Sequence, residues 1–526
     1  MKKLSLLLLL LMLTACGTLS TVLGPDELLI YDENEENDMY AGFAPIQVPA
    51  TTSQLPESDG TLRLSMRHPI TLNPLLNEDV TVAKILRLIF EPLVVLDENF
   101  RATSHLAEIE LASDFTGAVV TIRSDAFWAD GMPVTSDDLI FSVATLRNAP
   151  TNAIYRRNAE NIADITRIDM RSVQINFHQA SIDAGICLNF PIIPQHHYSG
   201  QTNPRSHANM NPLGNAPFMM ELHTPMRSIT LMQNPYSFRN RPQIEEIEVI
   251  FLPDAQTELY AFDQGRIHAL NLSLTEWARH LSVRHIRHEI VNAMYFVFIG
   301  FNFEREIFHD IQIRRGIAHA FNIDEVVSAV YLTHAVRAAS PIHPYNWAAS
   351  NVAGIEHNPF RAFAILSAIE LYEPITILAN ADNPQRVSIA NRLAAALHTA
   401  GLPATAVIVP YDEYFARLES GDFDLFIGGV NLPFMLDFGF LFGGGFFIYD
   451  HVLDSALSAI PGAITEPAHR QAVANFQQAF VDHIPVIGLA FRHSAVLTNM
   501  HISQNQAPPP CNIFGVVNLW SLPRHP

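Results

Sequence analysis

From about residue 62 onward, the chain alternates short apolar runs with amphipathic helical patterns. Residues 119–122 form one such β-rich run, and a helical pattern follows over 136–147. Thr135 and Asp138 have the spacing of a capping box at the start of this pattern. Its apolar residues recur at helical spacing: Leu139, Val143 and Leu146. The stripe predicts a helix that packs its apolar face on a sheet.

A second unit predicts a parallel sheet in the later part of the chain. Residues 375–379 have the pattern of a strand, and Asn383 with Pro384 supplies an N-cap and a first helical residue. The helical pattern stops at Gly401, and residues 405–409 form a returning strand. Such a crossover almost always connects parallel strands of one sheet. This region is therefore predicted to be α/β.

Length and charge restrict the class of protein further. The chain has 526 residues with 48% hydrophobic content, and a single core stops growing near 250 to 300 residues. We therefore expect an α/β protein of two lobes with a ligand cleft between them. The formal net charge is -21, and no basic stripe is present that could neutralise phosphates. Nucleic acid is excluded as an expected partner.

The first residues predict the compartment. Lys2 and Lys3 precede an apolar run over 4–13, which is about half the length needed to span a bilayer. The run ends in Leu-Thr-Ala-Cys-Gly over 13–17, which resembles the lipobox of bacterial lipoproteins. This resemblance implies a signal peptide over 1–15 and a lipid-carrying Cys16. The expected location is extracytoplasmic, with lipid as the membrane anchor.

Residues 16–60 are rich in acidic residues and proline, and are expected to form a flexible, lipid-anchored tether. Beyond Cys16, the cysteines are Cys187 and Cys511. They could pair in an extracellular setting, or both could be free buried thiols. No CxxC motif or zinc-type spacing occurs.

The sequence offers no recognisable catalytic machinery. It lacks a GxSxG elbow, an HExxH motif and a phosphate-binding GxxxxGK[ST] loop. The chain has 23 histidines, but their spacing fits no three-ligand set on one rigid element. We therefore predict no enzyme activity, no catalytic residue, no bound metal and no cofactor.

Residues 127–138, Phe-Trp-Ala-Asp-Gly-Met-Pro-Val-Thr-Ser-Asp-Asp, resemble the "W-x-D-G-x-P-[VL]-T-[AS]-x-D" signature of the family 5 solute-binding proteins. Further matches follow in the family's order: 71–74, 90–93, 212–218, 234–236, 265–268 and 313–321. Physically these motifs mostly build scaffold, because they contain tight turns, helix starts and buried stripes. The resemblance runs from about residue 62 to near the C-terminus.

This resemblance implies the type II, cluster C fold of periplasmic-binding proteins. The expected boundaries are 61–270 for the first part of lobe 1, 271–480 for lobe 2, and 481–526 for the return to lobe 1. The chain then crosses between the lobes twice, and the lobes close over ligand by hinge bending.

The resemblance also suggests which residues face the cleft. In the family, a loop after the strand "G-D-[FY]-D-L", here 421–425, commonly presents an aspartate to a peptide's amino terminus. The loop that follows lacks the family's tryptophan and has Pro433 at the aligned aspartate position, so Asp437 is the candidate for this role. The other candidates are Asn431 and Phe434 on the same loop, Tyr345 and Trp347 in the "S-P-[IV]-P" loop, and Asn77 and Glu78 in lobe 1. The structural alternatives are a solvated loop aspartate for Asp437, loop packing for Asn431 and Phe434, a surface-covering loop for the two aromatic residues, and an ordinary helix cap for the lobe 1 pair.

The expected function is that of the substrate-binding component of an ABC importer, which captures short peptides and delivers them to permease subunits. Family members carry different ligands on one scaffold, so a nickel chelate or a sugar is the alternative cargo. A receptor that reports ligand to a membrane sensor is the alternative role.

Overall fold

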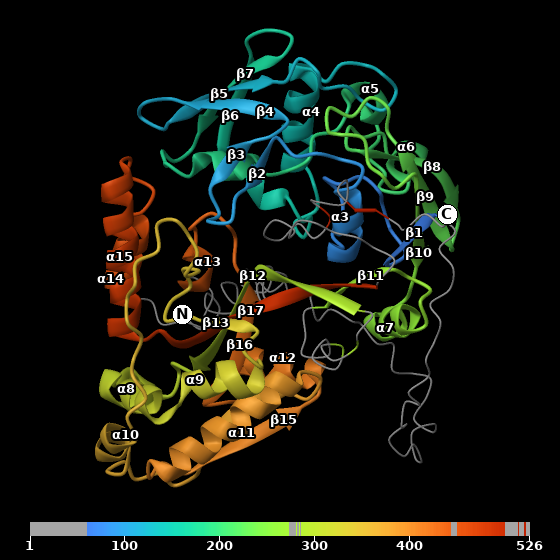
Figure 1. Ribbon diagram of the computed structural model, residues 1–526. Coiled ribbons are helices and arrows are strands. Elements are labelled where there is room, and N and C mark those ends of the chain that lie inside the picture. The colour runs from blue at the N-terminus through green and yellow to red at the C-terminus, as the bar shows by residue number, and fades with distance from the viewer. Residues whose placement is uncertain are drawn as a thin grey trace, which may run out of the picture.

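The computed structural model describes residues 60–272, 280, 283, 286–442, 450–499, 514 and 520–521. The predicted signal peptide, Cys16, the tether up to residue 59 and Cys511 lie outside this part of the chain. The described strands form sheets in an upper and a lower body that meet at the centre (Figure 1). We call the upper body lobe 1 and the lower body lobe 2.

Lobe 1 contains two four-stranded sheets and a short hairpin. The first sheet has the order β1-β10-β9-β8, with bounds Thr61–Met66, Glu246–Phe251, Ser228–Gln233 and Phe218–Thr224. The second sheet is antiparallel and has the order β4-β5-β7-β6, with bounds Ala107–Leu111, Gly117–Ile122, Ser172–Phe177 and Ile162–Arg167. The hairpin pairs β2 (Val94–Leu96) with β3 (Ala102–Ser104).

The helices of lobe 1 are short apart from α4. They are α3 (Val80–Leu86), α4 (Ser136–Arg147), α5 (Gln195–Tyr198), α6 (His207–Met210) and α7 (Ala255–Asp263), with 3-10 turns η3 (Arg156–Ala159) and η4 (Ala184–Leu188). The predicted helix over 136–147 and its capping box between Thr135 and Asp138 are confirmed. The predicted stripe is also confirmed, since all three of its members are fully buried: Leu139, Val143 and Leu146.

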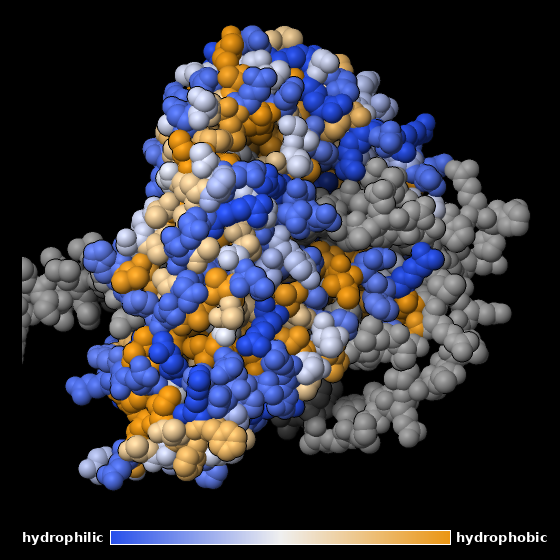
Figure 2. Space-filling view, turned by 60° about the vertical axis from the view of Figure 1, so that its left-hand side comes forward, coloured by the Kyte–Doolittle hydropathy of each residue, from blue (hydrophilic) through white to orange (hydrophobic). Residues whose placement is uncertain are grey.

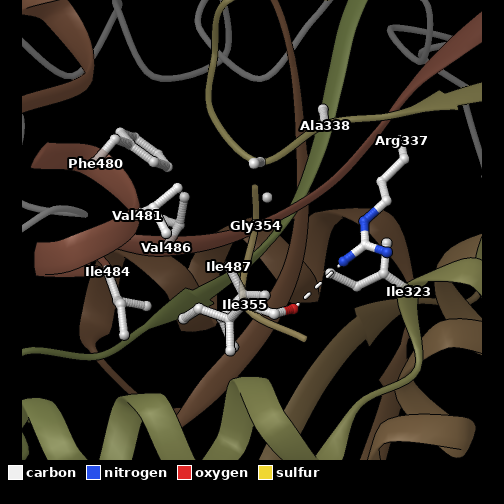
Figure 3. Close-up of a pocket in the computed structure, with 12 residues that line it drawn as sticks. Ile323, Arg337, Ala338, Gly354, Ile355, Phe480, Val481, Ile484, Val486 and Ile487 are labelled. Atoms are coloured by element: carbon white, nitrogen blue, oxygen red, sulfur yellow. Dashed lines mark hydrogen bonds between the residues drawn. The ribbon is translucent and has the colours of Figure 1, made fainter. Parts of the chain in front are cut away.

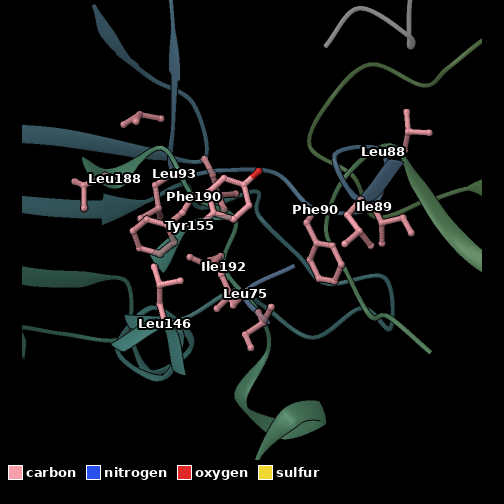
Figure 4. Close-up of a cluster of buried hydrophobic side chains, with 14 of the residues drawn as sticks. Leu75, Leu88, Ile89, Phe90, Leu93, Leu146, Tyr155, Leu188, Phe190 and Ile192 are labelled. Atoms are coloured by element: carbon pink, nitrogen blue, oxygen red, sulfur yellow. The ribbon is translucent and has the colours of Figure 1, made fainter. Parts of the chain in front are cut away.

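The core of lobe 1 draws side chains from segments far apart in sequence. Figure 4 shows Phe90, Leu146, Tyr155, Phe190 and their neighbours pointing into one interior. The same cluster includes Phe514 and Trp520 from near the C-terminus. These two residues therefore pack with side chains from the first half of the chain. Cys187 lies in this core as a free thiol, and burial raises its pKa to about 12.

Lobe 2 is built on a seven-stranded sheet. Its order is β11-β17-β12-β16-β14-β15, with bounds Ala269–Leu272, Val486–Asn499, Ile286–Phe301, Leu425–Asn431, Ile375–Asn380 and Ala404–Val409. The short β13 (Ala335–Arg337) pairs with β17. Along β12, Phe296 and Phe298 belong to one apolar cluster, whereas Val297 and Ile299 belong to another. This alternation is the two-residue period of a strand that is buried on both faces.

Helices cover both faces of this sheet (Figure 1). They are α8 (Ile311–Ala320), α9 (Ile323–Glu325), α10 (Pro359–Leu366), α11 (Pro384–Thr399), α12 (Tyr411–Ser420), α13 (Gly439–Phe442), α14 (His451–Ser458) and α15 (Glu466–His483), with turns η6 (Glu306–His309) and η7 (Val326–Val330). The predicted strand-helix-strand unit is confirmed: β14 and β15 pair in parallel, and the Asn383 side chain caps α11.

The long strands β12 and β17 connect the two lobes. Val291 of β12 and Val496 of β17 lie in the core of lobe 1, whereas Phe298 and Phe491 lie in lobe 2. The two strands pair antiparallel, and their register shifts between Val291 and Tyr295. The regular pairing of the two strands is thus interrupted where the ribbon passes from one core to the other. The domain boundaries at 270 and 480 stay a prediction.

The face shown in Figure 2 interleaves hydrophilic side chains with apolar groups. At the far end of lobe 2, Phe360 and Phe363 of α10 are 89% and 55% exposed. Among the described residues, no helix is both long enough and apolar enough to span a membrane.

Candidate ligand site at the junction of the lobes

The turn between β2 and β3 places a lobe 1 side chain inside lobe 2. Phe100 is fully buried and belongs to the apolar cluster of Phe298 and Phe491. Its ring centroid lies 5.0 Å from that of His343 and 5.9 Å from that of Phe434. Phe100 also has a φ of 62°, in the left-handed region that bulky residues rarely adopt. The strain of this turn is offset by burial of the ring in the opposite lobe.

Trp347, one of the predicted cleft residues, connects the lobes through both its backbone and its side chain. Its backbone N–H donates to the carbonyl oxygen of Asn99 at 3.1 Å, and its Nε1 donates to Oδ1 of Asp183 at 3.1 Å. The guanidinium of Arg101 lies 4.1 Å from the indole centroid. On the other face, the ring stacks on His469 at 5.1 Å. Asp183, Asn99 and Arg101 come from lobe 1, whereas His469 lies on α15 of lobe 2.

Tyr345, the other aromatic candidate of this loop, is 45% exposed. Its backbone N–H donates to Nδ1 of His343 at 3.1 Å. Burial, together with the nearby His493, lowers the pKa of His343 to about 3. Burial, together with His334, lowers the pKa of His493 to about 4. Both imidazoles are therefore neutral near pH 7.

These two imidazoles have unused polar atoms. Nε2 of His343 and both ring nitrogens of His493 are buried and have no hydrogen-bond partner among the described residues. His493 lies on β17 two residues after Phe491, so the two side chains share a face of the strand. The ring of Phe491 lies 4.5 Å from that of His343. Aromatic rings thus surround two buried, neutral imidazoles at the lobe junction. Because Nδ1 of His343 accepts the Tyr345 N–H, Nε2 of this neutral ring carries the hydrogen.

The loop after β16 carries the three remaining lobe 2 candidates. Asn431 ends β16, is exposed and pairs in register with Tyr295 of β12. Phe434 is partly buried against Phe100. Asp437 is exposed, and its Oδ1 accepts the backbone N–H of Gly439 at 3.3 Å. The structure therefore brings Phe434 to the junction, whereas Asp437 bonds within its own turn.

The lobe 1 candidates Asn77 and Glu78 precede α3. Asn77 is buried, its Nδ2 donates to the carbonyl oxygen of Asp79 at 2.7 Å, and its Oδ1 accepts the Asp79 N–H at 3.2 Å. Asp79 in turn caps the helix through the N–H groups of Thr81 and Val82. Glu78 is exposed. Asn77 thus shapes the turn before α3, whereas the helix cap is Asp79.

The sequence reasoning missed several junction residues. Phe434, Tyr345 and Trp347 gather near Phe100, but Phe100 itself was not a candidate. Asp183 and His469 approach each other at 3.3 Å across 286 positions of sequence, and no local motif marks either residue. His343 had a detectable signal, because it lies between two prolines in the aromatic loop that was already singled out.

Two cavities lie near these elements. The first has a volume of about 160 Å³ and is lined by Arg101, Asp183 and Trp347, together with apolar residues of lobe 1. A space of this size accommodates about one small ring. The second, in lobe 2, measures about 20 Å³ beside Arg337, whose guanidinium donates to the Ile355 carbonyl (Figure 3). This volume has room for about one water molecule, not for a substrate.

The signature motif serves the scaffold of lobe 1. Trp128 is fully buried, and its Nε1 donates to Oδ2 of Asp138, the capping residue of α4. Gly131 has a φ of 85°, which the turn between Trp128 and Met132 requires. The predicted structural role of this motif is confirmed.

The motifs over 90–93 and 212–218 meet in the same lobe. A Cβ on Gly214 would lie 1.9 Å from the Ile89 carbonyl oxygen, so this contact needs glycine. Glu91 binds His105 at 2.7 Å and Arg239 at 3.1 Å. Burial raises the pKa of Glu91, but these two partners outweigh burial and lower it overall. The motif residues thus anchor the interior of lobe 1.

No set of three or more His, Cys, Asp or Glu side chains within the described ranges has a geometry that could hold a metal ion.

Two lobes joined by paired long strands, with aromatic side chains at their junction, define the fold of a two-lobe periplasmic-binding protein. Residues 102–443 match the model of the bacterial extracellular solute-binding proteins, family 5 Middle. The chain belongs to this family. It is a family of solute-binding components of transporters, and the lobed α/β fold predicted from the resemblance is confirmed.

Similar proteins carry different ligand descriptions. A Brucella ovis protein named as a candidate ABC transporter peptide-binding protein is 24% identical over 320 residues, or 58% of this chain. The oligopeptide-binding protein AppA of Bacillus subtilis is 22% identical over 309 residues, or 56% of this chain. The chain spans 60% and 55% of the length of these two relatives.

Solved structures extend the likeness in fold. The structure of Campylobacter jejuni NikZ in complex with Ni(L-His) matches 88% of this chain and all of its own, at a TM-score of 0.71 and 19% identity. The structure of Bacillus subtilis AppA in complex with a nonapeptide matches 88% of this chain and 99% of its own, at a TM-score of 0.68 and 18% identity.

Proposed function

We propose that this chain is the substrate-binding component of an ABC importer and that it captures short peptides between lobe 1 and lobe 2. The observation that carries this proposal is the paired crossing of β12 and β17 from one core to the other, with a register shift at the crossing. Such a connection lets two rigid lobes bend about a short hinge. The peptide-binding names of the relatives support the choice of cargo.

In this proposal, the chain works outside the cytoplasm, anchored by lipid at Cys16, and hands its cargo to permease subunits. The lipobox-like sequence supports the anchor, and the acidic segment that follows supports a flexible tether. The net charge of -21 keeps the protein soluble close to the membrane.

We assign the predicted candidates as follows. Phe434 and Tyr345 provide apolar walls, because one packs on Phe100 and the other is half exposed beside His343. Asn431 offers a hydrogen-bonding side chain at the open end of β16. The exposed carboxylate of Asp437 is the acceptor for a peptide's amino terminus.

The remaining three candidates complete the proposed site. Glu78 faces solvent from lobe 1, and Asn77 holds the turn that presents it. Trp347 contributes the edge of the site next to the junction.

Thermal-shift measurements on the purified chain test the cargo. Short-peptide pools, Ni²⁺ with and without L-histidine, and oligosaccharides are compared as additives. A ligand at 100 times its dissociation constant adds about 2.7 kcal/mol to the free energy of unfolding. Stabilisation by the peptide pools is expected, and its absence at millimolar peptide would refute the peptide assignment.

The role of Asp437 needs a matched pair of variants. Asp437→Asn removes the proposed partner of the peptide ammonium, and we expect peptide affinity to fall about tenfold or more. Asp382→Asn changes an exposed loop aspartate elsewhere in lobe 2 and should leave affinity unchanged. Equal affinities for the two variants would remove Asp437 from the site. Titration calorimetry with a peptide that stabilises the wild type provides the comparison.

A metal chelate is the second candidate cargo, and the His343–His493 pair favours it. Neutral imidazoles with free ring nitrogens are the form that binds transition metals. Here burial keeps both rings neutral, and both ring nitrogens of His493 are unbonded within the described structure. Metal binding by His343 would have to break the hydrogen bond that its Nδ1 accepts from the Tyr345 N–H. Two imidazoles would occupy two coordination positions of a bound metal ion, so a small chelator could fill the remaining positions.

Calorimetric titration with Ni²⁺ and L-histidine tests this second candidate. Binding should weaken at least tenfold in His343→Gln and in His493→Gln, but not in His357→Gln, which changes an exposed histidine. If the wild type binds Ni²⁺ with L-histidine and all three variants bind it equally well, the metal site does not include His343 or His493.

A further inference from the structure

We propose that Trp347, Asp183, Arg101 and Glu466 form a latch that favours the closed arrangement of the lobes even without ligand. On the lobe 1 side, the latch consists of residues from the β2–β3 hairpin and the adjacent η4 segment. On the lobe 2 side, it consists of residues from the Trp347 loop and α15. This inference goes beyond the proposed cargo, because each of its contacts is within the protein.

The outer part of the latch is an ion pair between the lobes. A guanidinium nitrogen of Arg101 lies 2.8 Å from Oε1 of Glu466, which begins α15. Because the same guanidinium covers the indole of Trp347, its position is fixed from two sides. Arg470, one turn further along α15, approaches the indole at 5.4 Å. Arg101 of lobe 1 and Arg470 of lobe 2 therefore both approach the ring of Trp347, and only the Arg101 contact crosses the junction.

The inner part of the latch is buried. Asp183 is 12% exposed, His469 is 1% exposed, and Oδ2 of Asp183 lies 3.3 Å from Nε2 of His469. The remaining oxygen of Asp183 accepts the indole N–H. Opening the lobes would separate the carboxylate from both groups at once. Closure thus places the carboxylate beside partners that come from lobe 2.

Phe100 adds an apolar part to the same contact. Its ring is fully buried among lobe 2 side chains, although the residue lies at the tip of a lobe 1 hairpin. Opening would expose this ring to water while the hairpin kept its left-handed φ of 62°. Strained residues of this kind persist where the surrounding structure holds them, and they cluster at moving parts.

Incomplete packing makes the latch suitable for release. The cavity of about 160 Å³ is bounded by three latch residues, Arg101, Asp183 and Trp347. The contact is therefore a few directed interactions beside empty space, not a continuous core. Interfaces between domains that move are typically smaller and more polar than the interior of a domain.

Distance measurements between the lobes test the latch in the ligand-free chain. Spin labels are placed on Glu108→Cys in lobe 1 and Asn391→Cys in lobe 2, both at exposed positions, with Cys16 and Cys511 changed to serine. Double electron–electron resonance then gives the populations of short and long distances. The wild-type latch predicts a substantial short-distance population without ligand.

Charge-reversal variants distinguish loss of the ion pair between the lobes from general effects of mutation. Arg101→Glu and Glu466→Arg should each reduce the short-distance population at least twofold, and the double variant should recover most of it. The control reverses Arg167 and Asp137, an ion pair at 3.0 Å with similar exposure that lies within lobe 1. This control should leave the distances unchanged.

Trp347→Phe provides a second test, because it keeps a ring but removes the indole N–H. It should also reduce the short-distance population, with a circular-dichroism spectrum like that of the wild type. The latch is overturned if the wild type shows only the long distance. It is equally overturned if the single reversals leave the populations unchanged, or if the double variant recovers nothing. A failure of peptide binding would bear only on the proposed cargo.

Discussion

Two regions of this molecule join distant segments in different ways. In the scaffold of lobe 1, Trp128, Asp138 and Gly214 are packed and hydrogen-bonded within one core. At the lobe junction, Phe100 is strained, and Oδ2 of Asp183 lies 3.3 Å from Nε2 of His469 but makes no hydrogen bond within the described part of the chain. Stable interiors tolerate few such defects, whereas contacts that must open can retain them. Lobe 1 also contains unpaired buried atoms, such as Nδ2 of Asn215, and positive-φ residues, such as Phe115. The two regions therefore differ in the origin of their contacts: the scaffold contacts lie within one core, whereas the junction contacts join residues of two lobes.

The largest loss of stability is expected from a substitution in the scaffold of lobe 1. Gly214→Ala would place a methyl group 1.9 Å from the Ile89 carbonyl oxygen, so backbone must shift. We expect a loss of about 3 kcal/mol in the free energy of unfolding, measured by urea denaturation. Gly462→Ala, where no heavy atom lies within 4 Å of the new methyl, should change stability by less than about 0.5 kcal/mol. Equal losses would show that the close approach is not what requires glycine.

A somewhat smaller effect comes from the capping residue of α4. Asp138→Ala removes the acceptor of the Trp128 indole N–H and of the backbone N–H of Gln195. We expect a loss of about 2 kcal/mol, because buried donors are left unpaired. The neighbouring Asp137→Ala removes only an exposed ion pair to Arg167 and should cost less than about 1 kcal/mol. Denaturation of both variants under the same conditions gives the comparison.

The junction has its own signature in the dependence of stability on pH. The pKa of His343 is lowered from 6.5 to about 3, so below pH 6.5 the unfolded chain binds a proton that the folded chain does not. Stability contributed by this group is therefore lost as pH falls from about 6.5 toward 3. His343→Gln should flatten the slope by up to about 1.4 kcal/mol per pH unit. Urea denaturation between pH 6 and pH 4 measures the slope of stability against pH. His357→Gln, which changes an exposed histidine, is the control. An unchanged slope in His343→Gln would contradict a buried neutral imidazole.

The smallest expected effect on stability concerns the outer latch. Arg101→Gln removes an ion pair whose side chains are 39% and 49% exposed. We expect less than about 1 kcal/mol of change in global unfolding, because exposed pairs are screened by solvent. A loss of several kcal/mol would mean that Arg101 supports folding in the way the scaffold does. Calorimetric unfolding distinguishes the two cases.

The difference between these regions also explains what the sequence could predict. Trp128 and Asp138 lie ten residues apart, and Asn383 lies beside the helix that it caps, so local patterns located them. Asp183 and His469 meet only because two lobes fold against each other, and neither has a local signature. Tyr345, Trp347 and Phe434 were found through family resemblance, and the structure places them near the unpredicted Phe100. The ligand-binding role of all seven candidates stays a prediction.

The central claim is that two lobes close on a peptide, and X-ray scattering of the chain titrated with short peptides tests it most directly. The account predicts a smaller radius of gyration that saturates over the same peptide concentrations as the thermal shift. Thermal stabilisation by peptides with no change in the radius of gyration would show binding without closure and would contradict this claim. Neither thermal stabilisation nor compaction at millimolar peptide would contradict the claim.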